Sequence, residues 1–406
     1  MRFKKHSLII TALAGLCLML LNGCNAILSR DYMVITPHLE NRLDEEVDDE
    51  QRAETFQELK DSILRLVEEG YEVGIIRLYN YAGDVDEDTE AAITYTMRNQ
   101  PLGAYAVEYV SYKSVRILSY YEITLTITYR KTPEEIASIK KIDNFEDYRR
   151  VLLDTYSEYG ELVTVEIPWF YSDQYSVTDI LREHYVNNPL MFATAPSVSQ
   201  KEFPDVERGE ESGWRRILEI SFNYFADPDE LYEMTRKLVS ELGTRLSETE
   251  LPGDEMRFLT LKNLLIKDVN ILPDPEEVQE KLSNINSTAY SAVINGIANS
   301  EGFALAYKAL CDMVNIDCLV VQGRRDGLLH SWNLVVADDG EWYHIDTTDD
   351  NTIADGLFIL FTDEQMSDSG YRWDSGDYPS TGKDAVSVFI PEDTTFVESE
   401  EEPTLP

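Results

Sequence analysis

Residues 295–307 read NGIANSEGFALAY, and two further short motifs follow them, HSWN at 330–333 and WYHID at 342–346. Beyond Ser300 apolar residues recur at the spacing of one helix face, which predicts a helix that begins near this serine. Asn299 and Ser300 precede that run as candidate N-cap residues. We therefore expect the Ser300 side chain at a helix N-terminus, where free backbone N–H groups and the helix dipole favour negative charge.

The two later motifs lie on predicted strands. Asp338–Gly340 has the residues of a tight hairpin turn. An antiparallel hairpin about this turn brings His330 and Asp346 to opposite or nearly opposite positions. There the carboxylate could fix the tautomer of the imidazole, leaving the other ring nitrogen to face Ser300. The predicted strands cover residues 318–321, 331–336 and 342–345.

This order of motifs resembles the transglutaminase-like superfamily, in which a nucleophilic Cys precedes Gly-Tyr-Ala and is followed by His-x-Trp-Asn and Trp-Tyr-x-x-Asp. The resemblance covers residues 254–378 and implies a papain-like fold with a triad of Ser300, His330 and Asp346. The chain departs from the family at the nucleophile, because Ser300 stands where the family has Cys. Trp332 is either a wall of the implied cleft or a buried core residue.

The function turns on the Ser300 hydroxyl. A thiol next to His and a helix N-terminus readily becomes a thiolate, whereas a hydroxyl needs a general base during attack. We therefore expect a degenerate triad in a module that binds peptide or cell-wall polymer. The alternative is an active acyl transferase or amide hydrolase that uses Ser300, His330 and Asp346. Without this context, Ser300 could be a plain helix cap, and the other two residues an ordinary hairpin pair.

The remaining candidate groups support no second site. Cys311 and Cys318 are expected to be small core hydrophobes, with pairing in an oxidising compartment as the alternative. His344 is assigned no role. No metal-ligand motif is present in the sequence, and we expect no cofactor.

The N-terminus predicts where the protein is located. A basic segment and a short apolar run, residues 8–21, are followed by Leu-Asn-Gly-Cys at 21–24. This resembles a bacterial lipobox, and implies a lipoprotein signal peptide over residues 1–23 and lipidation of Cys24. The alternative is an uncleaved anchor helix. Both place the rest of the chain outside the cytoplasm, held at the membrane.

Composition limits the class of partner. The chain has 76 acidic and 35 basic residues and a net charge of −41. Such a field repels nucleic acid and anionic lipid head groups, so the expected partners are protein, peptide or cell-wall polymer. Acidic runs predict a solvated tether over residues 24–58 and an acidic C-terminal tail over residues 379–406.

The fold class predicted is α+β. Residues 59–244 form an α/β region in which two parts, 59–148 and 149–244, share a pattern of strand, helix, two strands and helix. We interpret this pattern as an internal duplication, with similar but unrelated elements as the alternative. Thr132 and Asp227 are expected to cap the last helix of each part. A transglutaminase-like domain is predicted over residues 245–378.

Overall fold

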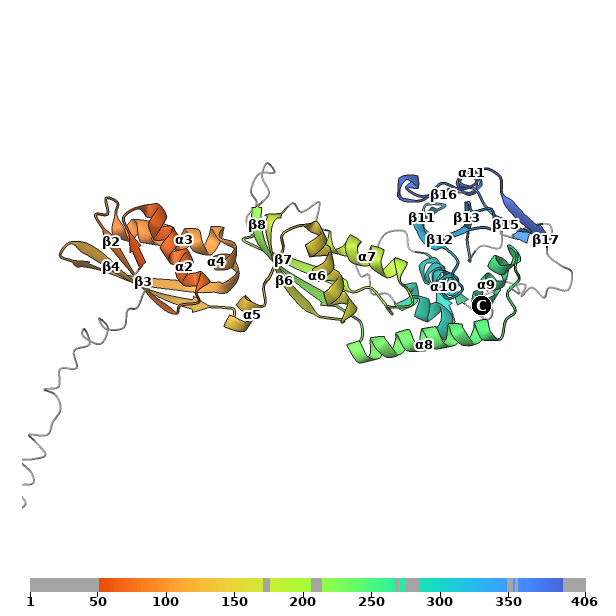
Figure 1. The fold of residues 1–406 in the computed structure, drawn as a ribbon, viewed down its shortest axis with the longest axis horizontal. Helices are drawn as coiled ribbons and strands as arrows, with labels where there is room; N and C mark the ends of the chain where they lie inside the picture. Colours follow the sequence, from red (N-terminus) through yellow and green to blue (C-terminus); the bar gives the residue numbers. More distant parts are fainter. Residues whose placement is uncertain are drawn as a thin grey trace, which may run out of the picture. The chain divides into compact units, whose positions relative to one another are not determined.

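The computed structural model describes residues 51–170, 176–205, 214–266, 270–274, 285–348, 353–354 and 357–389. The predicted signal peptide, Cys24 and residues 24–50 of the predicted tether lie outside these ranges. The predicted α+β class is confirmed, because helices accompany sheets whose strand pairs are mostly antiparallel (Figure 1). None of the helices within the described ranges is long and apolar enough to cross a membrane.

Tertiary contacts divide the described chain into two units. The first runs to Ile63 and adds Val73–Ala92 and Ser111–Thr126, and the second contains the remaining described residues. All residues of the candidate site belong to the second unit.

The first sheet has four strands in the order β1-β2-β4-β3, with β1 parallel to β2 and β2 antiparallel to β4. The side chains of Ile76, Leu78, Ile123 and Leu125 are fully buried, which is the alternation expected of strands with one covered face. The strands are β1 Gln51–Ala53, β2 Val73–Tyr79, β3 Val107–Ile117 and β4 Tyr120–Tyr129. The helices in this stretch are α2 Phe56–Glu68, α3 Val85–Asn99, α4 Pro101–Ala106 and α5 Pro133–Ala137.

The second sheet repeats this strand order as β5-β6-β8-β7, again with a parallel first pair and an antiparallel second pair. Its strands are β5 Lys140–Lys141, β6 Leu162–Phe170, β7 Ser197–Phe203 and β8 Trp214–Asn223. Its helices are α6 Phe145–Ser157, α7 Val177–Asn187 and α8 Pro228–Ser247. The strand, helix, two strands and helix predicted for each part are all present, while a common origin by duplication stays a prediction.

The two predicted helix caps are present. The Thr132 side chain accepts a hydrogen bond from the Glu135 backbone N–H in a capping box, and the Asp227 side chain accepts one from the Glu230 N–H. Both helices have proline at their first position, where the missing N–H costs no hydrogen bond because this N–H has no partner within the helix.

The last part of the chain carries the candidate site. Its helices are α9 Met256–Ile266, α10 Ser300–Met313 and α11 Asp363–Asp368, with a 3-10 turn at Ile285–Ser287 and a π-helical turn at Ser291–Asn295. Strands β13 Trp342–Ile345, β12 Leu328–Val336, β11 Cys318–Arg325 and β16 Tyr371–Arg372 form one sheet in that order. Two smaller sheets pair β9 Asn270–Ile271 with β10 Ile297–Ala298, and β15 Leu357–Leu360 with β14 Ile353–Ala354 and β17 Val386–Phe389.

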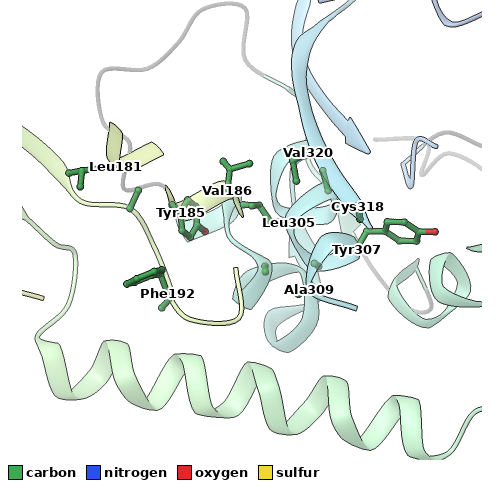
Figure 2. Close-up of a cluster of buried hydrophobic side chains, with 14 of the residues drawn as sticks. Leu181, Tyr185, Val186, Phe192, Leu305, Tyr307, Ala309, Cys318 and Val320 are labelled. Carbon is green, nitrogen blue, oxygen red and sulfur yellow. The ribbon is translucent and has the colours of Figure 1, made fainter. Parts of the chain in front are cut away.

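One hydrophobic core joins the second sheet to this last part. It extends from Leu181 and Tyr185 on α7, through Leu305 and Tyr307 on α10, to Val320 on β11 (Figure 2). Because these side chains share one core, α7 is fixed against the helix and sheet that carry the site.

Several predicted boundaries differ from the structure. Strand β1 and the start of α2 lie within the predicted tether of residues 24–58, because the apolar face of this segment is buried with the first sheet. Likewise β17 lies within the predicted tail of residues 379–406, because it pairs with β15. The predicted boundaries at residues 148 and 244 fall inside α6 and α8, so neither marks a junction between elements.

Candidate functional site

Ser300 is the first residue of α10, and Asn299 is its N-cap. The Asn299 side chain accepts a hydrogen bond from the Gly302 N–H at 3.2 Å, so the cap is supplied by the asparagine and not by Ser300. Gly302 is needed for packing, since a Cβ there would lie 2.7 Å from the Cβ of Ala298 and 3.0 Å from the Thr288 carbonyl oxygen. This packing holds the first turn of α10, and with it the Ser300 side chain.

His330 lies on β12, and Asp346 follows the end of β13. The two strands are antiparallel and are joined by the predicted turn, where Gly340 has a φ of 82°. The imidazole Nε2 of His330 and Oδ2 of Asp346 are 2.6 Å apart. The structure therefore places the predicted imidazole and carboxylate in the orienting geometry expected from the sequence.

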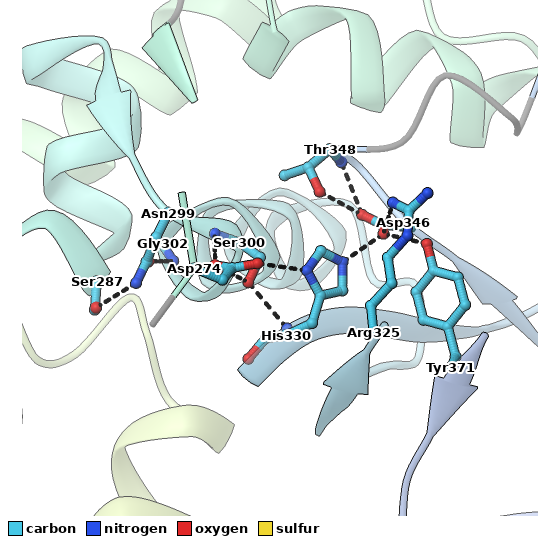
Figure 3. Close-up of polar contacts among 11 residues, drawn as sticks. Asp274, Ser287, Asn299, Ser300, Gly302, Arg325, His330, Asp346, Thr348 and Tyr371 are labelled. Carbon is cyan, nitrogen blue, oxygen red and sulfur yellow. Dashed lines mark hydrogen bonds and ion pairs between the residues drawn. The ribbon is translucent and has the colours of Figure 1, made fainter. Parts of the chain in front are cut away.

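A second carboxylate lies between Ser300 and His330. The Ser300 hydroxyl donates to Oδ1 of Asp274 at 2.7 Å, and the Nδ1 of His330 is 2.6 Å from Oδ2 of the same carboxylate (Figure 3). The Ser300 backbone N–H also donates to Oδ1, at 3.1 Å. In the described part of the chain, the hydroxyl thus reaches the imidazole only through Asp274.

The Ser300 oxygen is also engaged as an acceptor. The Ser331 backbone N–H donates to Oγ of Ser300 at 3.0 Å. The hydroxyl proton and one lone pair are therefore both used inside the protein. The Ser300 N–H, one of the helix N-terminal donors expected to favour negative charge, is bound to the Asp274 carboxylate.

Asp274 reaches the site through backbone pairing. Strand β9 runs parallel to β10, which ends directly before the cap of α10. The Leu272 N–H donates to the Ala298 carbonyl oxygen at 2.8 Å and sets the position of the next two residues. Asp274 was not among the residues predicted for the site, because strands of two residues give no periodic signal. The only local hint is an acidic residue between Pro273 and Pro275 after an apolar pair.

His330 is held as an imidazolium. Its side chain is 7% exposed, and this burial alone would lower its pKa. The hydrogen bonds and charges of Asp274 and Asp346 outweigh that effect and raise the pKa of His330 to about 9. At neutral pH both ring nitrogens therefore carry protons, and each faces a carboxylate.

The Asp346 carboxylate is the more buried of the two. Burial raises its pKa, but hydrogen bonds from His330, Tyr371 and the Thr348 backbone hold it well below its usual range. Tyr371 donates from its hydroxyl to Oδ2 at 2.7 Å, and Thr348 donates from both its N–H and its hydroxyl to Oδ1 at 2.8 Å. Arg325 adds an ion pair at 3.7 Å (Figure 3).

Ser300, His330 and Asp274 line a cavity of about 1260 Å³. Arg182 on α7 also lines this cavity, and it donates to Glu301 at 2.8 Å and to the Gln322 side chain at 2.9 Å. Burial raises the pKa of Glu301, while Arg182 opposes that rise. The second sheet region thus contributes a wall of the cavity as well as a share of the core.

Trp332 does not line this cavity, so of its two predicted roles the cleft wall is wrong and the buried core residue is the one that the structure shows. It is fully buried and packs against Tyr371 and Trp373, because its ring points into the core beneath the sheet. Its indole N–H donates to Nδ1 of His344, whose Nε2 is 2.9 Å from Asp363. Burial lowers the pKa of His344 against the opposing effect of Asp363, so His344 is a neutral structural residue.

The two cysteines of this part are free and buried, as small core residues. Burial raises the pKa of the Cys311 thiol, and the neighbouring Cys318 adds to that rise. Both thiols are buried and neither lines the cavity, so neither replaces the nucleophile. Among the described residues, no group of three or more His, Cys, Asp or Glu side chains is placed to hold a metal ion.

No family model and no curated protein matches the chain. Among solved structures, a transglutaminase is 13% identical with a TM-score of 0.24, over 52% of this chain and 59% of that chain. A cysteine protease candidate from Cytophaga hutchinsonii is 12% identical with a TM-score of 0.24, over 49% and 80%. A protease candidate from Parabacteroides distasonis is 10% identical with a TM-score of 0.20, over 60% and 57%.

The chain therefore spans less than two thirds of the length of that transglutaminase. Similarity at this level does not identify an activity, which has to be judged from the geometry of the site.

Proposed function

We propose that this chain is a lipid-anchored extracytoplasmic bacterial protein, with a transglutaminase-like domain that binds peptide or cell-wall polymer and does not catalyse acyl transfer. The observation that carries the non-catalytic assignment is the Asp274 carboxylate between the Ser300 hydroxyl and the His330 imidazole. The transglutaminase-like assignment rests on the motif order and on the convergence of Ser300, His330 and Asp346.

A serine nucleophile requires a base that can take its proton during attack. His330 is poorly suited to that role, because its pKa is raised to about 9 and its Nδ1 faces Asp274. Attack on a carbonyl also requires a free donor for the developing oxyanion, and the Ser300 N–H is already bound to Asp274. The base and one oxyanion donor are therefore both occupied.

Binding is favoured by the cavity itself. Its volume exceeds that of the usual pocket for a small molecule, and one wall is the polar group of Arg182, Glu301 and Gln322. A cleft with many hydrogen-bonding groups and little charge imbalance suits a peptide or a peptide-bearing polymer.

A cysteine substitution tests whether Asp274 blocks the nucleophile. In Ser300→Cys, the adjacent carboxylate disfavours a second negative charge, so we expect reaction with iodoacetamide at neutral pH no faster than for an ordinary thiol. In Ser300→Cys combined with Asp274→Ala, the imidazolium can pair with the thiolate, and the reaction should be faster at and below neutral pH. Mass spectrometry of the peptide that carries residue 300 separates this thiol from the others. Rapid reaction of the single variant would contradict the blocking role.

The alternative, an acyl transferase or amide hydrolase, is favoured by the hydrogen bond between His330 and Asp346. It requires Asp274 to leave the site. Turnover of glutamine peptides or wall fragments by Asp274→Ala, lost again when Ser300→Ala is added, would support this alternative over the binding function.

The anchor is proposed from the basic segment, the apolar run and the lipobox around Cys24. Cys24→Ser should release the protein into the medium or leave an unprocessed precursor, whereas Cys17→Ser should have no effect on anchoring. Normal cleavage and membrane retention of Cys24→Ser would rule the lipoprotein assignment out.

A further inference from the structure

The Asp274 carboxylate occupies a position that a ligand in the cavity could otherwise reach. Oδ1 accepts from the Ser300 N–H at 3.1 Å and from its hydroxyl at 2.7 Å, and Oδ2 bonds to Nδ1 of His330 at 2.6 Å. Both oxygens of the carboxylate are used, by donors on two different elements. The donor set therefore fits a planar carboxylate, with the imidazolium supplying the opposite charge.

Within the described ranges, Asp274 is held through this side chain. Backbone pairing of β9 with β10 ends at the Leu272 N–H, and Pro273 has no N–H to donate. Among the described residues, the Asp274 backbone has no hydrogen-bond partner. A competing carboxylate would therefore have to replace three side-chain hydrogen bonds, without breaking a strand pairing.

The rest of the cavity can accommodate a chain attached to such a carboxylate. Its volume of about 1260 Å³ leaves room beyond the carboxylate for several residues. The lining includes hydroxyl, amide and apolar groups suited to a peptide backbone and its side chains, among them Thr178, Thr194, Asn286, Thr288 and Trp373.

We propose that the cavity binds peptide-like ligands by a free carboxylate, which displaces the Asp274 carboxylate and takes over its hydrogen bonds from Ser300 and His330. This rests on the proposed function, because it assigns the cavity to binding and not to acyl transfer. Asp274 then acts as an internal competitor that lowers the affinity for every such ligand. Its removal should raise that affinity by the loss of competition alone.

Acetate is the probe, and acetamide is the uncharged control of the same shape. Acetate should bind saturably to Asp274→Ala, and the binding is followed through the His330 ring resonances. The wild type should bind acetate more weakly, by a factor on the order of ten or more, which is the ratio expected for one charge-assisted competitor. Acetamide should bind neither protein measurably. Adding His330→Gln to Asp274→Ala should weaken acetate binding by a similar factor, measured for this variant and for Asp274→Ala alone by isothermal titration calorimetry, because the double variant has no His330 resonance.

Equal acetate affinity in the wild type and Asp274→Ala would overturn the inference, as would absence of binding to folded Asp274→Ala. Circular dichroism checks folding, and Asp274→Ser provides a second variant if the alanine protein does not fold. These results are independent of the test of catalysis. Turnover by the wild type would contradict the proposed function, whereas a failed acetate titration would contradict only the role of the carboxylate.

Discussion

Replacing Asp274 with Asn should return His330 to an ordinary imidazole. In the wild type, the two carboxylates raise its pKa from 6.5 to about 9, against the opposing effect of burial. That difference corresponds to about 3 kcal/mol in favour of the protonated form in the folded state. Asn keeps the shape of the side chain but removes one of the two charges, and losing a charge in direct contact lowers a pKa by about 1–3 units. We therefore expect His330 in Asp274→Asn to titrate between about 6 and 8.

The effect on folding has a defined sign. Because the pKa of His330 is raised in the folded state, protonation of its imidazole stabilises the fold. This contribution is complete below the unfolded pKa of 6.5 and is lost as the pH rises through about 9. In Asp274→Asn, the contribution should be smaller and should be lost at lower pH.

The assay is a proton NMR titration of the imidazole ring, with His330→Gln to assign the resonance. Asp179→Asn is the matched control, because Asp179 lines the same cavity without bonding to the imidazole. The reasoning would be refuted by a wild-type His330 that titrates near 6.5, or by an unchanged pKa in Asp274→Asn.

Three further substitutions test the supports of the site. Asn299→Ala removes the cap of α10 and should lower the free energy of unfolding by about 1 kcal/mol, measured by urea denaturation against Asn295→Ala. Trp332→Phe leaves the buried Nδ1 of His344 without its donor and should cost about 1–3 kcal/mol; an unchanged stability would contradict the structural role of this pair. Asp346→Asn removes a buried partner of the imidazolium and should cost about 3 kcal/mol at neutral pH. Because the pKa of Asp346 is lowered in the folded state, this difference should shrink as the pH falls below about 4, which acid titration of both proteins would reveal.

The helix, the hairpin and the pair of His330 and Asp346 could be predicted from the sequence because each depends on local signals. The apolar spacing after Ser300 sets α10, and Asp338–Gly340 sets the turn that aligns β12 with β13. Strand alternation could not decide whether Trp332 faces a cleft or the core. That choice depends on what packs over the sheet, here Tyr371 and Trp373 from a later segment.

Asp274 could not be predicted in the same way. Its position depends on a parallel pairing of two-residue strands, β9 and β10, that are separated by more than twenty residues along the chain. The wall that includes Arg182 could not be predicted either, because α7 belongs to the preceding sheet region and meets the site only through nonlocal contacts, namely the shared core and the Arg182 hydrogen bonds. The contacts that change the expected chemistry of this site are thus the nonlocal ones.

Labelling with a fluorophosphonate probe tests most directly whether Ser300 is a nucleophile. Intact-mass spectrometry of the wild type, Ser300→Ala and Asp274→Ala after exposure to the probe at neutral pH gives the stoichiometry, and peptide mapping gives the position. If Asp274 holds both the Ser300 hydroxyl and the His330 imidazole, the wild type should remain unlabelled at residue 300, at the level of Ser300→Ala. Stoichiometric labelling of the wild type at Ser300, absent from Ser300→Ala, would contradict the non-catalytic account.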